Sequence, residues 1–203
     1  MPRPILTEKI RTAILISGGG SNMVSLVKAA QEADYPAKVK LVICNRPNAG
    51  GLAKAKSLGI ETFCIDHKNF KTRKAFEQEM DKTLREHDIE LICNAGFMRI
   101  LSPWFVGRWL GRQLNIHPSL LPKFKGLHTH ERAIEAGESE HGCTIHYVDE
   151  GMDTGEIIAQ AKVNVLASDT NETLAAKVLQ QEHILYPAIL KTVACALIAK
   201  RPQ

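Results

Sequence analysis

The feature that most constrains the fold is the regular alternation of short, apolar β-rich runs with segments of helical periodicity. Strands that alternate with helices are connected by right-handed crossovers, so they form a mainly parallel sheet. The predicted strands are 13–16, 39–44, 62–65, 91–95 and 113–116, and the predicted helices between them are 22–31, 51–58 and 73–86. Ligands of such sheets bind outside the carboxyl ends of the strands, so the residues that follow each strand are the first candidates for a site.

The pattern changes near Gly142. Residues 143–148 alternate in polarity, a second β-rich run covers 157–165, and turn-forming residues separate them, which predicts a long-looped antiparallel hairpin. A helix over 171–185 follows, and Pro187 is expected to break or restart it before a last helix over 188–200. We therefore expect an α/β fold: a Rossmann-like, mainly parallel sheet with helices on both faces, an added C-terminal antiparallel hairpin and a C-terminal helix.

Length and composition narrow the class of protein. The 203 residues contain no repeat or linker, which predicts a single domain (1–203, core about 12–187). The net charge of +4 suits small anionic molecules, and no cluster of Lys and Arg indicates nucleic-acid binding. Since no apolar run approaches the ~20 residues of a membrane span, and the first residues lack the apolar segment of a signal peptide, we expect a cytoplasmic protein without membrane partners.

Five cysteines are widely spaced and form no C-x-x-C pair. Cys44, Cys64, Cys93 and Cys143 stand among apolar residues, where a small core residue is expected. The sequence therefore predicts buried free thiols rather than disulfides or metal ligands.

A glycine-rich loop, 17–22, follows the first predicted strand. Glycines let backbone N–H groups approach an anion, and the N-terminus of the next helix adds a partial positive charge. The match to G-x-G-x-x-G is incomplete, because Met23 occupies the third glycine position, and G-K-[ST] is absent. The loop indicates either a site for a single phosphate group or a tight turn capped by Ser21 or Asn22.

Asn115 and His117 end the fifth predicted strand two residues apart, so their side chains leave the same face. Pro118 favours an extended backbone at His117. Asn115 can donate to an oxygen that gains negative charge, and His117 can move a proton near neutral pH. The pair is suited to acyl transfer; a capped loop with a surface histidine is the alternative.

The hairpin adds a second polar face, since Thr144 and His146 alternate with apolar residues. This face is either solvated or lines a site. The loop that follows carries three carboxylates: Asp149, Glu150 and Asp153. A carboxylate beside an imidazole stabilises its protonated form, but spacing does not distinguish among the three.

Taken together, the motifs resemble the phosphoribosylglycinamide formyltransferase family. The segments that carry the resemblance are 17–22, 96–103, 115–122, 126–130, 141–142 and 153–155, in that order. They lie within about 13–187, nearly the whole chain, and 115–130 is the most specific stretch.

The resemblance implies roles for particular residues. Its catalytic trio falls on Asn115, His117 and Asp153. The remaining implied site residues are Gly20, Ser21 and Asn22 for the phosphate of the acceptor, Glu182 for a contact with the acceptor, and Arg73, Met98, Arg99, Ile100, Leu101 and Asn115 for the folate. A cis peptide is implied at Leu121-Pro122.

The implied activity is transfer of a formyl group from 10-formyltetrahydrofolate, as co-substrate, to the amine of glycinamide ribonucleotide in purine biosynthesis. The implied partners are these small molecules, with a monomer or homodimer as the assembly. The histidines are numerous between 117 and 146, but their spacings match no familiar zinc pattern, so we expect no metal.

Two related classes and one unrelated class remain as alternatives. A formyltetrahydrofolate hydrolase would use water in place of the amine, and its class normally carries an extra N-terminal regulatory domain. Methionyl-tRNA formyltransferase would need a further C-terminal domain and a basic RNA-binding surface. A non-catalytic folate- or nucleotide-binding module would not need the combination of amide, imidazole and carboxylate.

Overall fold

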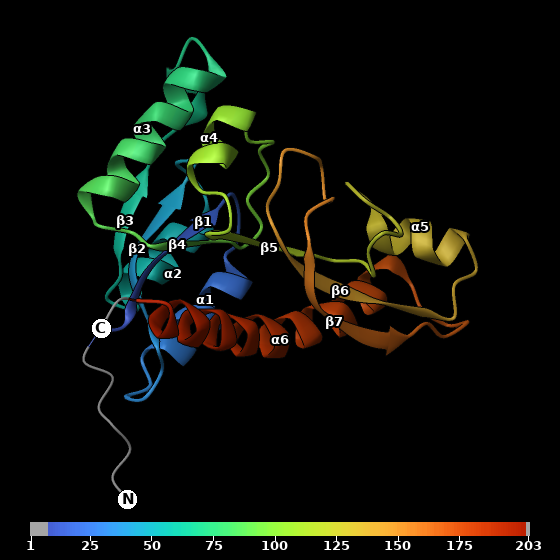
Figure 1. The fold of residues 1–203 in the computed structure, drawn as a ribbon. Coiled ribbons are helices and arrows are strands. Elements are labelled where there is room, and N and C mark those ends of the chain that lie inside the picture. The colour runs from blue at the N-terminus through green and yellow to red at the C-terminus, as the bar shows by residue number, and fades with distance from the viewer. Residues whose placement is uncertain (1–7, 202–203) are drawn as a thin grey trace, which may run out of the picture.

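The computed structural model describes residues 8–201, which form a seven-stranded sheet covered by helices (Figure 1). The strands are β1 (Ile10–Ile16), β2 (Ala37–Cys44), β3 (Glu61–Cys64), β4 (Leu91–Asn94), β5 (Gln113–His117), β6 (Glu140–Tyr147) and β7 (Ile157–Asn164). The helices are α1 (Ser21–Ala30), α2 (Gly50–Ser57), the 3-10 turn η1 (His67–Asn69), α3 (Arg73–Glu86), α4 (Pro103–Arg108), α5 (Thr129–Glu135) and α6 (Asn171–Ala199). The segment before residue 8, with the predicted absence of a signal peptide, lies outside the described residues.

The strand order is β3-β2-β1-β4-β5-β6-β7. The strands β1 to β5 pair in parallel, whereas β6 and β7 are antiparallel to their neighbours. The predicted α/β class, with its mainly parallel sheet and added hairpin, is confirmed. In the sheet, β2 and β3 lie on one side of β1, and β4 lies on the other side. The topological switch point is therefore between β1 and β4.

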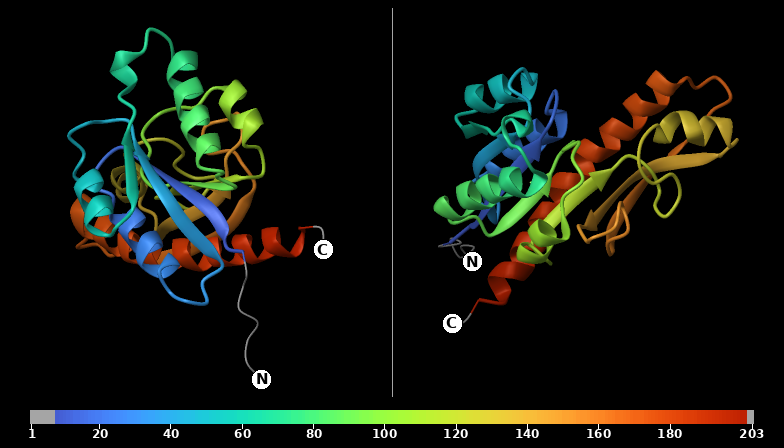
Figure 2. Two further views of the ribbon diagram at one scale, coloured as in Figure 1. Left: turned by 90° about the vertical axis from the view of Figure 1, so that its left-hand side faces the viewer. Right: turned by 90° about the horizontal axis from the view of Figure 1, so that it is seen from above.

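Alternating side chains of the strands supply two apolar layers. On one face, Ile14 and Ile16 pack in a core that includes residues of α1 and α6. On the other face, Ala13 and Leu15 pack with residues of α3 and α4. Figure 1 shows α3 and α4 on the opposite side of the sheet from α6, and Figure 2 shows α6 running from the hairpin end of the molecule toward the C-terminus.

The predicted break at Pro187 is wrong, because α6 continues from Asn171 to Ala199. The proline forfeits one helical hydrogen bond, a cost of about 3 kcal/mol. The burial of Tyr186 and Leu190 on the sheet offsets this cost, at about 1.5–3 kcal/mol for each large side chain. Tyr35 also donates a hydrogen bond to the carbonyl of Pro187, at 2.6 Å.

By length and composition alone, α6 is long and apolar enough to cross a membrane. A core helix of a globular protein passes the same test. Here α6 packs against α1, β6 and β7, and its buried residues recur every three or four positions, as expected for a helix that covers a sheet.

Other predicted elements are confirmed with ends that differ by a few residues, while α4, α5 and η1 were not predicted. Cys44, Cys93 and Cys143 are buried free thiols, as expected. The expectation for Cys64 is wrong: it is exposed, because β3 is an edge strand whose residues are only partly covered.

Candidate active site

The glycine loop connects β1 to α1 and adopts a conformation that only glycine fits well. Gly20 has φ of +69°, and a Cβ there would lie 3.0 Å from the Cα of Gly51 and from the Cε of Met23. Gly20 is the N-cap of α1, and within the described part of the chain no side chain caps it. The first N–H groups of α1 therefore have no side-chain partner at this end, which favours the anion site over the capped turn.

Behind this loop, Asn22 and Glu182 form a buried pair. The Nδ2 of Asn22 donates to Oε2 of Glu182 at 2.7 Å, and both residues are less than a tenth exposed. Burial raises the pKa of the Glu182 carboxyl above its usual value. The Oδ1 of Asn22 is buried without a hydrogen-bond partner among the described residues, so it can accept a hydrogen bond from a ligand.

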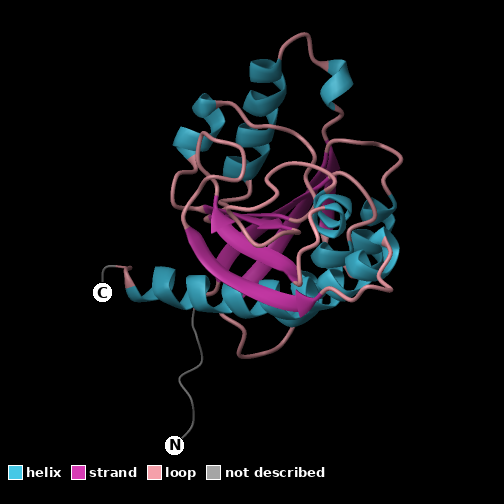
Figure 3. Cartoon of the chain, turned by 90° about the vertical axis from the view of Figure 1, so that its right-hand side faces the viewer, coloured by secondary structure: helices cyan, strands magenta, loops and turns pink. Residues whose placement is uncertain are grey.

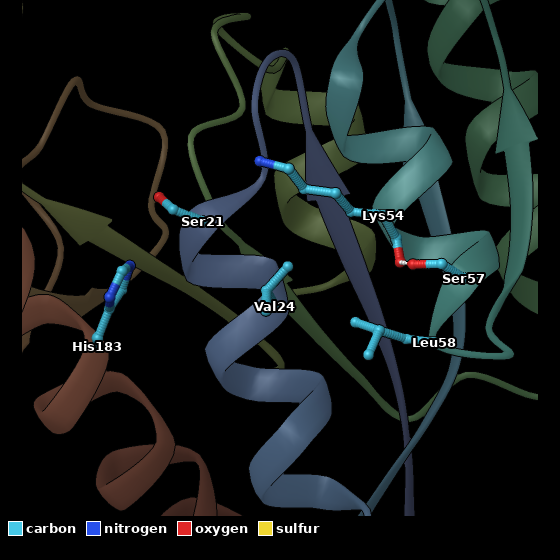
Figure 4. A pocket seen from close by; sticks show the side chains of 6 residues that line it. All are labelled: Ser21, Val24, Lys54, Ser57, Leu58 and His183. Carbon is cyan, nitrogen blue, oxygen red and sulfur yellow. Dashed lines mark hydrogen bonds between the residues drawn. The ribbon is translucent and has the colours of Figure 1, made fainter.

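A groove runs beside the same loop, between α1, α2 and α6 (Figure 4). Its lining residues are Ser21, Val24, Lys54, Ser57, Leu58 and His183. The Nζ of Lys54 donates to the carbonyl of Gly19 at 2.9 Å, so the groove has a cation at its loop end.

Ser17 ties the glycine loop to the loop after β4, at the switch point of the sheet. Its N–H donates to the Gly96 carbonyl at 3.1 Å, and its Oγ accepts from the Met98 N–H at 2.7 Å. The same Oγ donates to Oδ1 of Asn45 at 2.6 Å. Ser17 was not predicted as a site residue, because these contacts join residues far apart in the chain.

The segment implied for the folate follows β4. Met98 and Ile100 are more than half exposed, Arg99 is half-buried, and Leu101 packs in the core with α3 and α4. Buried Glu77 of α3 anchors the end of this segment, since its carboxylate accepts from the backbone N–H of Ser102 at 2.7 Å and from the Ser102 hydroxyl.

Arg73 is the remaining predicted folate residue. It is the first residue of α3, one turn before Glu77, and its side chain is exposed. Among the described residues it makes no hydrogen bond or ion pair, so no polar contact joins it to the segment after β4. Its assignment stays a prediction.

A polar face on β5 and β6 brings together residues that are distant in sequence. The register pairs Asn115 with His146 and His117 with Thr144. The alternate residues Ile116 and Ile145 belong to the core on the other face. Since paired residues share a face, these four polar side chains lie together on one face of β5 and β6, two strands that Figure 1 shows side by side.

Asn115 and His146 are in contact across the two strands. The Nδ2 of Asn115 is 3.1 Å from the Nε2 of His146. The Nδ1 of His146 is 2.8 Å from the carbonyl of Tyr147, which can only accept, so Nδ1 carries the proton. Burial, together with the nearby His117, lowers the pKa of His146 below its ordinary value. The neutral Nε2 therefore accepts from the Asn115 amide.

His117 is buried between a carbonyl and a carboxylate. Its Nε2 donates to the Phe124 carbonyl at 2.9 Å, and its Nδ1 lies 3.3 Å from Oδ2 of Asp153. That carboxylate also accepts from the Gly126 N–H at 2.9 Å, and its other oxygen is 3.7 Å from Nε2 of His146. A doubly protonated His117 would donate to Phe124 and Asp153 at once.

The three loop carboxylates have different positions. Asp153, at φ +52°, turns its side chain inward until it is 13% exposed. Asp149 instead accepts from the Gly151 N–H and the Thr154 hydroxyl and so holds the turn, while Glu150 is exposed. The carboxylate that reaches the imidazole is that of Asp153.

Thr144 makes two hydrogen bonds to the segment that follows β5. Its hydroxyl donates to the Ser119 carbonyl at 2.6 Å and accepts from the Leu121 N–H at 3.0 Å. Leu121-Pro122 is a cis peptide, as the family resemblance predicted. Thr144 thus supports the segment that carries Phe124, the partner of His117.

Two further histidines lie behind this cluster. The Nδ1 of His130 is 3.1 Å from the Nε2 of buried His141, and burial lowers the pKa of His141 to about 4. Within residues 8–201, no three His, Cys, Asp or Glu side chains are grouped so that they could hold a metal ion.

Comparison with known proteins agrees with this geometry. The family described as formyl transferase matches residues 10–190. The chain is similar to phosphoribosylglycinamide formyltransferase of Escherichia coli K12, with 42% identity over 181 residues that cover 89% of this chain and 85% of that protein. It is also similar to the trifunctional purine biosynthetic protein adenosine-3 of Drosophila pseudoobscura pseudoobscura, at 47% identity over 200 residues. That match covers 98% of this chain and 15% of the longer protein.

Among solved structures, the chain resembles a phosphoribosylglycinamide formyltransferase from Brucella melitensis with a TM-score of 0.89 and 50% identity. The match covers 92% of this chain and 96% of the other. From the extent of these matches, this chain belongs to the formyl transferase family.

Proposed function

We propose that this protein transfers the formyl group of 10-formyltetrahydrofolate to the primary amine of glycinamide ribonucleotide, a step of de novo purine biosynthesis. The observation that carries the proposal is the convergence of Asn115, His117 and Asp153 from two separate segments of the chain. An amide donor, an imidazole and a carboxylate at one point form a suitable set for a tetrahedral oxyanion and a proton transfer.

The acceptor fits the site beside α1. In this proposal, Gly20, Ser21 and Asn22 bind its phosphate through backbone N–H groups at the start of the helix. Glu182 and the unpartnered Oδ1 of Asn22 then accept hydrogen bonds from other donor groups of the acceptor. Both residues are buried, so a ligand donor lost here would leave an acceptor unsatisfied.

The donor fits the segment after β4. The folate would contact Met98, Arg99, Ile100 and Leu101, with Arg73 near its charged end and Asn115 at the formyl group. The exposed apolar side chains of Met98 and Ile100 support this assignment, because a flat ring system would remove them from water. Ser17 would keep the donor and acceptor loops in a fixed relation.

The reaction is an acyl transfer between two nitrogens. The neutral amine attacks the formyl carbon, and the carbonyl oxygen becomes an oxyanion that accepts a hydrogen bond from Asn115 and is stabilised by the positive charge of protonated His117. Asp153 stabilises the charged imidazole. One proton then moves from the incoming nitrogen to N10 as the bond from the formyl carbon to N10 breaks, which leaves the formylated amine and tetrahydrofolate.

We infer that the partners are small molecules only, with no nucleic acid, no membrane and no metal, and that the enzyme is cytoplasmic and either a monomer or a homodimer. The proposed site draws on residues from the first loop to α6, which supports a single formyltransferase domain.

The test is to incubate the protein with 10-formyltetrahydrofolate in the presence and absence of glycinamide ribonucleotide. We expect tetrahydrofolate and the formylated amine to appear in equal amounts and only when the amine is present. Loss of donor without the amine would instead identify a hydrolase, and binding without turnover would identify a non-catalytic module. Either result contradicts the proposal.

A further inference from the structure

His146 is a buried group of the site that no proposed step uses. Its ring is enclosed between β5 and the loop after β6, and it is 3% exposed. It has two polar contacts within hydrogen-bond distance, the Tyr147 carbonyl at Nδ1 and the Asn115 amide at Nε2. A ring held at both nitrogens has a single tautomer and a single orientation.

This arrangement determines how the Asn115 amide is oriented. An amide nitrogen carries two hydrogens, and the acceptor at Nε2 of His146 takes one of them. The second hydrogen then has a fixed direction. If Nε2 carried a proton, it would face Oδ1 of Asn115 instead, and the amide would have to turn over.

We propose that His146 is a positioning residue, which holds the Asn115 amide so that its second N–H is aimed at the oxyanion of the transferred formyl group. The proposal rests on the proposed function. His146 itself does not touch the reacting atoms; it acts through Asn115.

The surroundings support a neutral ring. Burial lowers the pKa of His146, and the groups that face it are Asp153, His117 and Asp149 in addition to its two hydrogen-bond partners. The Oδ1 of Asp153 is 3.7 Å from Nε2, compared with 3.1 Å for the Asn115 nitrogen. The amide is therefore the group that this nitrogen orients most directly.

Two variants form a matched pair. In His146→Gln, the side-chain oxygen can reach the position of the ring Nε2 and accept from Asn115. In His146→Asn, the same amide group is one methylene shorter and cannot reach. We expect His146→Gln to keep kcat within about fivefold of the wild type, and His146→Asn to lower kcat by about 10- to 100-fold, a part of the 10²–10³ that a lost oxyanion donor costs. KM for both substrates should change by less than about twofold.

A double-mutant cycle identifies the group through which His146 acts. In the Asn115→Ala background, His146→Asn should lower kcat by less than about twofold, because the amide that it orients is gone. In the Asp153→Asn background, His146→Asn should still lower kcat by its full factor. Melting temperatures of all variants report whether each is folded.

The outcomes separate this inference from the proposed function. If the wild type does not transfer formyl to the amine, the proposed function fails. If the wild type transfers formyl but His146→Gln and His146→Asn have equal kcat, whether high or low, the positioning role is wrong. It is also wrong if the effect of His146→Asn persists undiminished in the Asn115→Ala background.

Discussion

The two ends of the site are constructed in different ways. The glycine loop after β1 offers backbone N–H groups at the start of α1, and its shape depends on a single left-handed residue, Gly20. The opposite end, on β5 and β6, offers side chains whose meeting depends on the register of two strands, Asn115 against His146. Figure 3, viewed from the hairpin side, shows how the hairpin extends the sheet beyond its parallel part.

The two ends of the site therefore tolerate different kinds of substitution. A loop that binds through its backbone accepts changes of side chain but not an added Cβ where φ is positive. A cluster of side chains accepts no loss of its polar atoms, and a strand slip of one residue would turn every member to the other face.

The largest effect in the comparison should come from the hairpin end. Asn115→Ala removes the proposed donor to the oxyanion and should lower kcat by about 10²–10³. Steady-state kinetics with both substrates measure this. The melting temperature should change little, since Asn115 is only partly buried; a kcat within about threefold of the wild type would remove Asn115 from the mechanism.

A histidine at the hairpin end should also lower the free energy of unfolding of the protein in acid. The pKa of His141 is lowered by burial from 6.5 to about 4, so the unfolded chain binds this proton at a higher pH than the folded chain does. Its contribution to stability is complete above pH 6.5 and is lost as the pH falls toward 4. Between pH 7 and 5 we expect a loss of about 2 kcal/mol from this group.

Urea unfolding at the two pH values measures the acid effect in matched variants. His141→Gln should have a free energy of unfolding that depends less on pH, by about 2 kcal/mol. His128→Gln serves as the control, because the His128 side chain is 73% exposed. An equal pH dependence in the wild type and His141→Gln would refute the assignment.

In the glycine loop, the effect of a Gly→Ala substitution on stability should depend on which glycine is replaced. Gly20→Ala forces a side chain into left-handed backbone against Gly51 and Met23, and should lower the free energy of unfolding by about 1–2 kcal/mol. It should also raise KM for the acceptor. A Cβ at Gly18 meets nothing within 4 Å, so Gly18→Ala should change stability by less than about 0.5 kcal/mol. Equal effects at both positions would contradict the described loop.

The smallest effect should come from the link between the two loops at the switch point. Ser17→Ala leaves the Met98 N–H without its acceptor, a loss of about 1 kcal/mol. We expect this loss to weaken binding of the folate donor, so KM for the donor should rise about fivefold. Ser57→Ala, which removes an exposed hydroxyl bonded to its own helix, should leave this KM unchanged. An unchanged KM in Ser17→Ala would limit Ser17 to a structural role.

The sequence predicted those features that depend on local pattern. Periodicity predicted the parallel strands and the hairpin, and the face shared by Asn115 and His117 follows from their spacing of two. The glycine loop was recognisable because positive φ requires a particular residue type. The choice of Asp153 over Asp149 came from the family resemblance, and the structure brings Asp153 against His117.

The features that escaped prediction depend on distant contacts. The contact between His146 and Asn115 spans 31 positions and follows from strand register, which no local pattern specifies. The contact of Ser17 with Met98 crosses the switch point of the sheet. The continuity of α6 through Pro187 results from tertiary burial, which outweighs the intrinsic cost of proline in a helix.

The central claim is that the imidazole and the carboxylate work as one unit on the transferred formyl group. The most direct test is the kcat of His117→Ala, Asp153→Asn and the double variant, measured with both substrates at saturation. We expect each single variant to lose about 10²–10⁴ in kcat, and the double variant to be no slower than the slower single one. If the two losses multiply in the double variant, or if Asp153→Asn retains the wild-type kcat, the claim is contradicted.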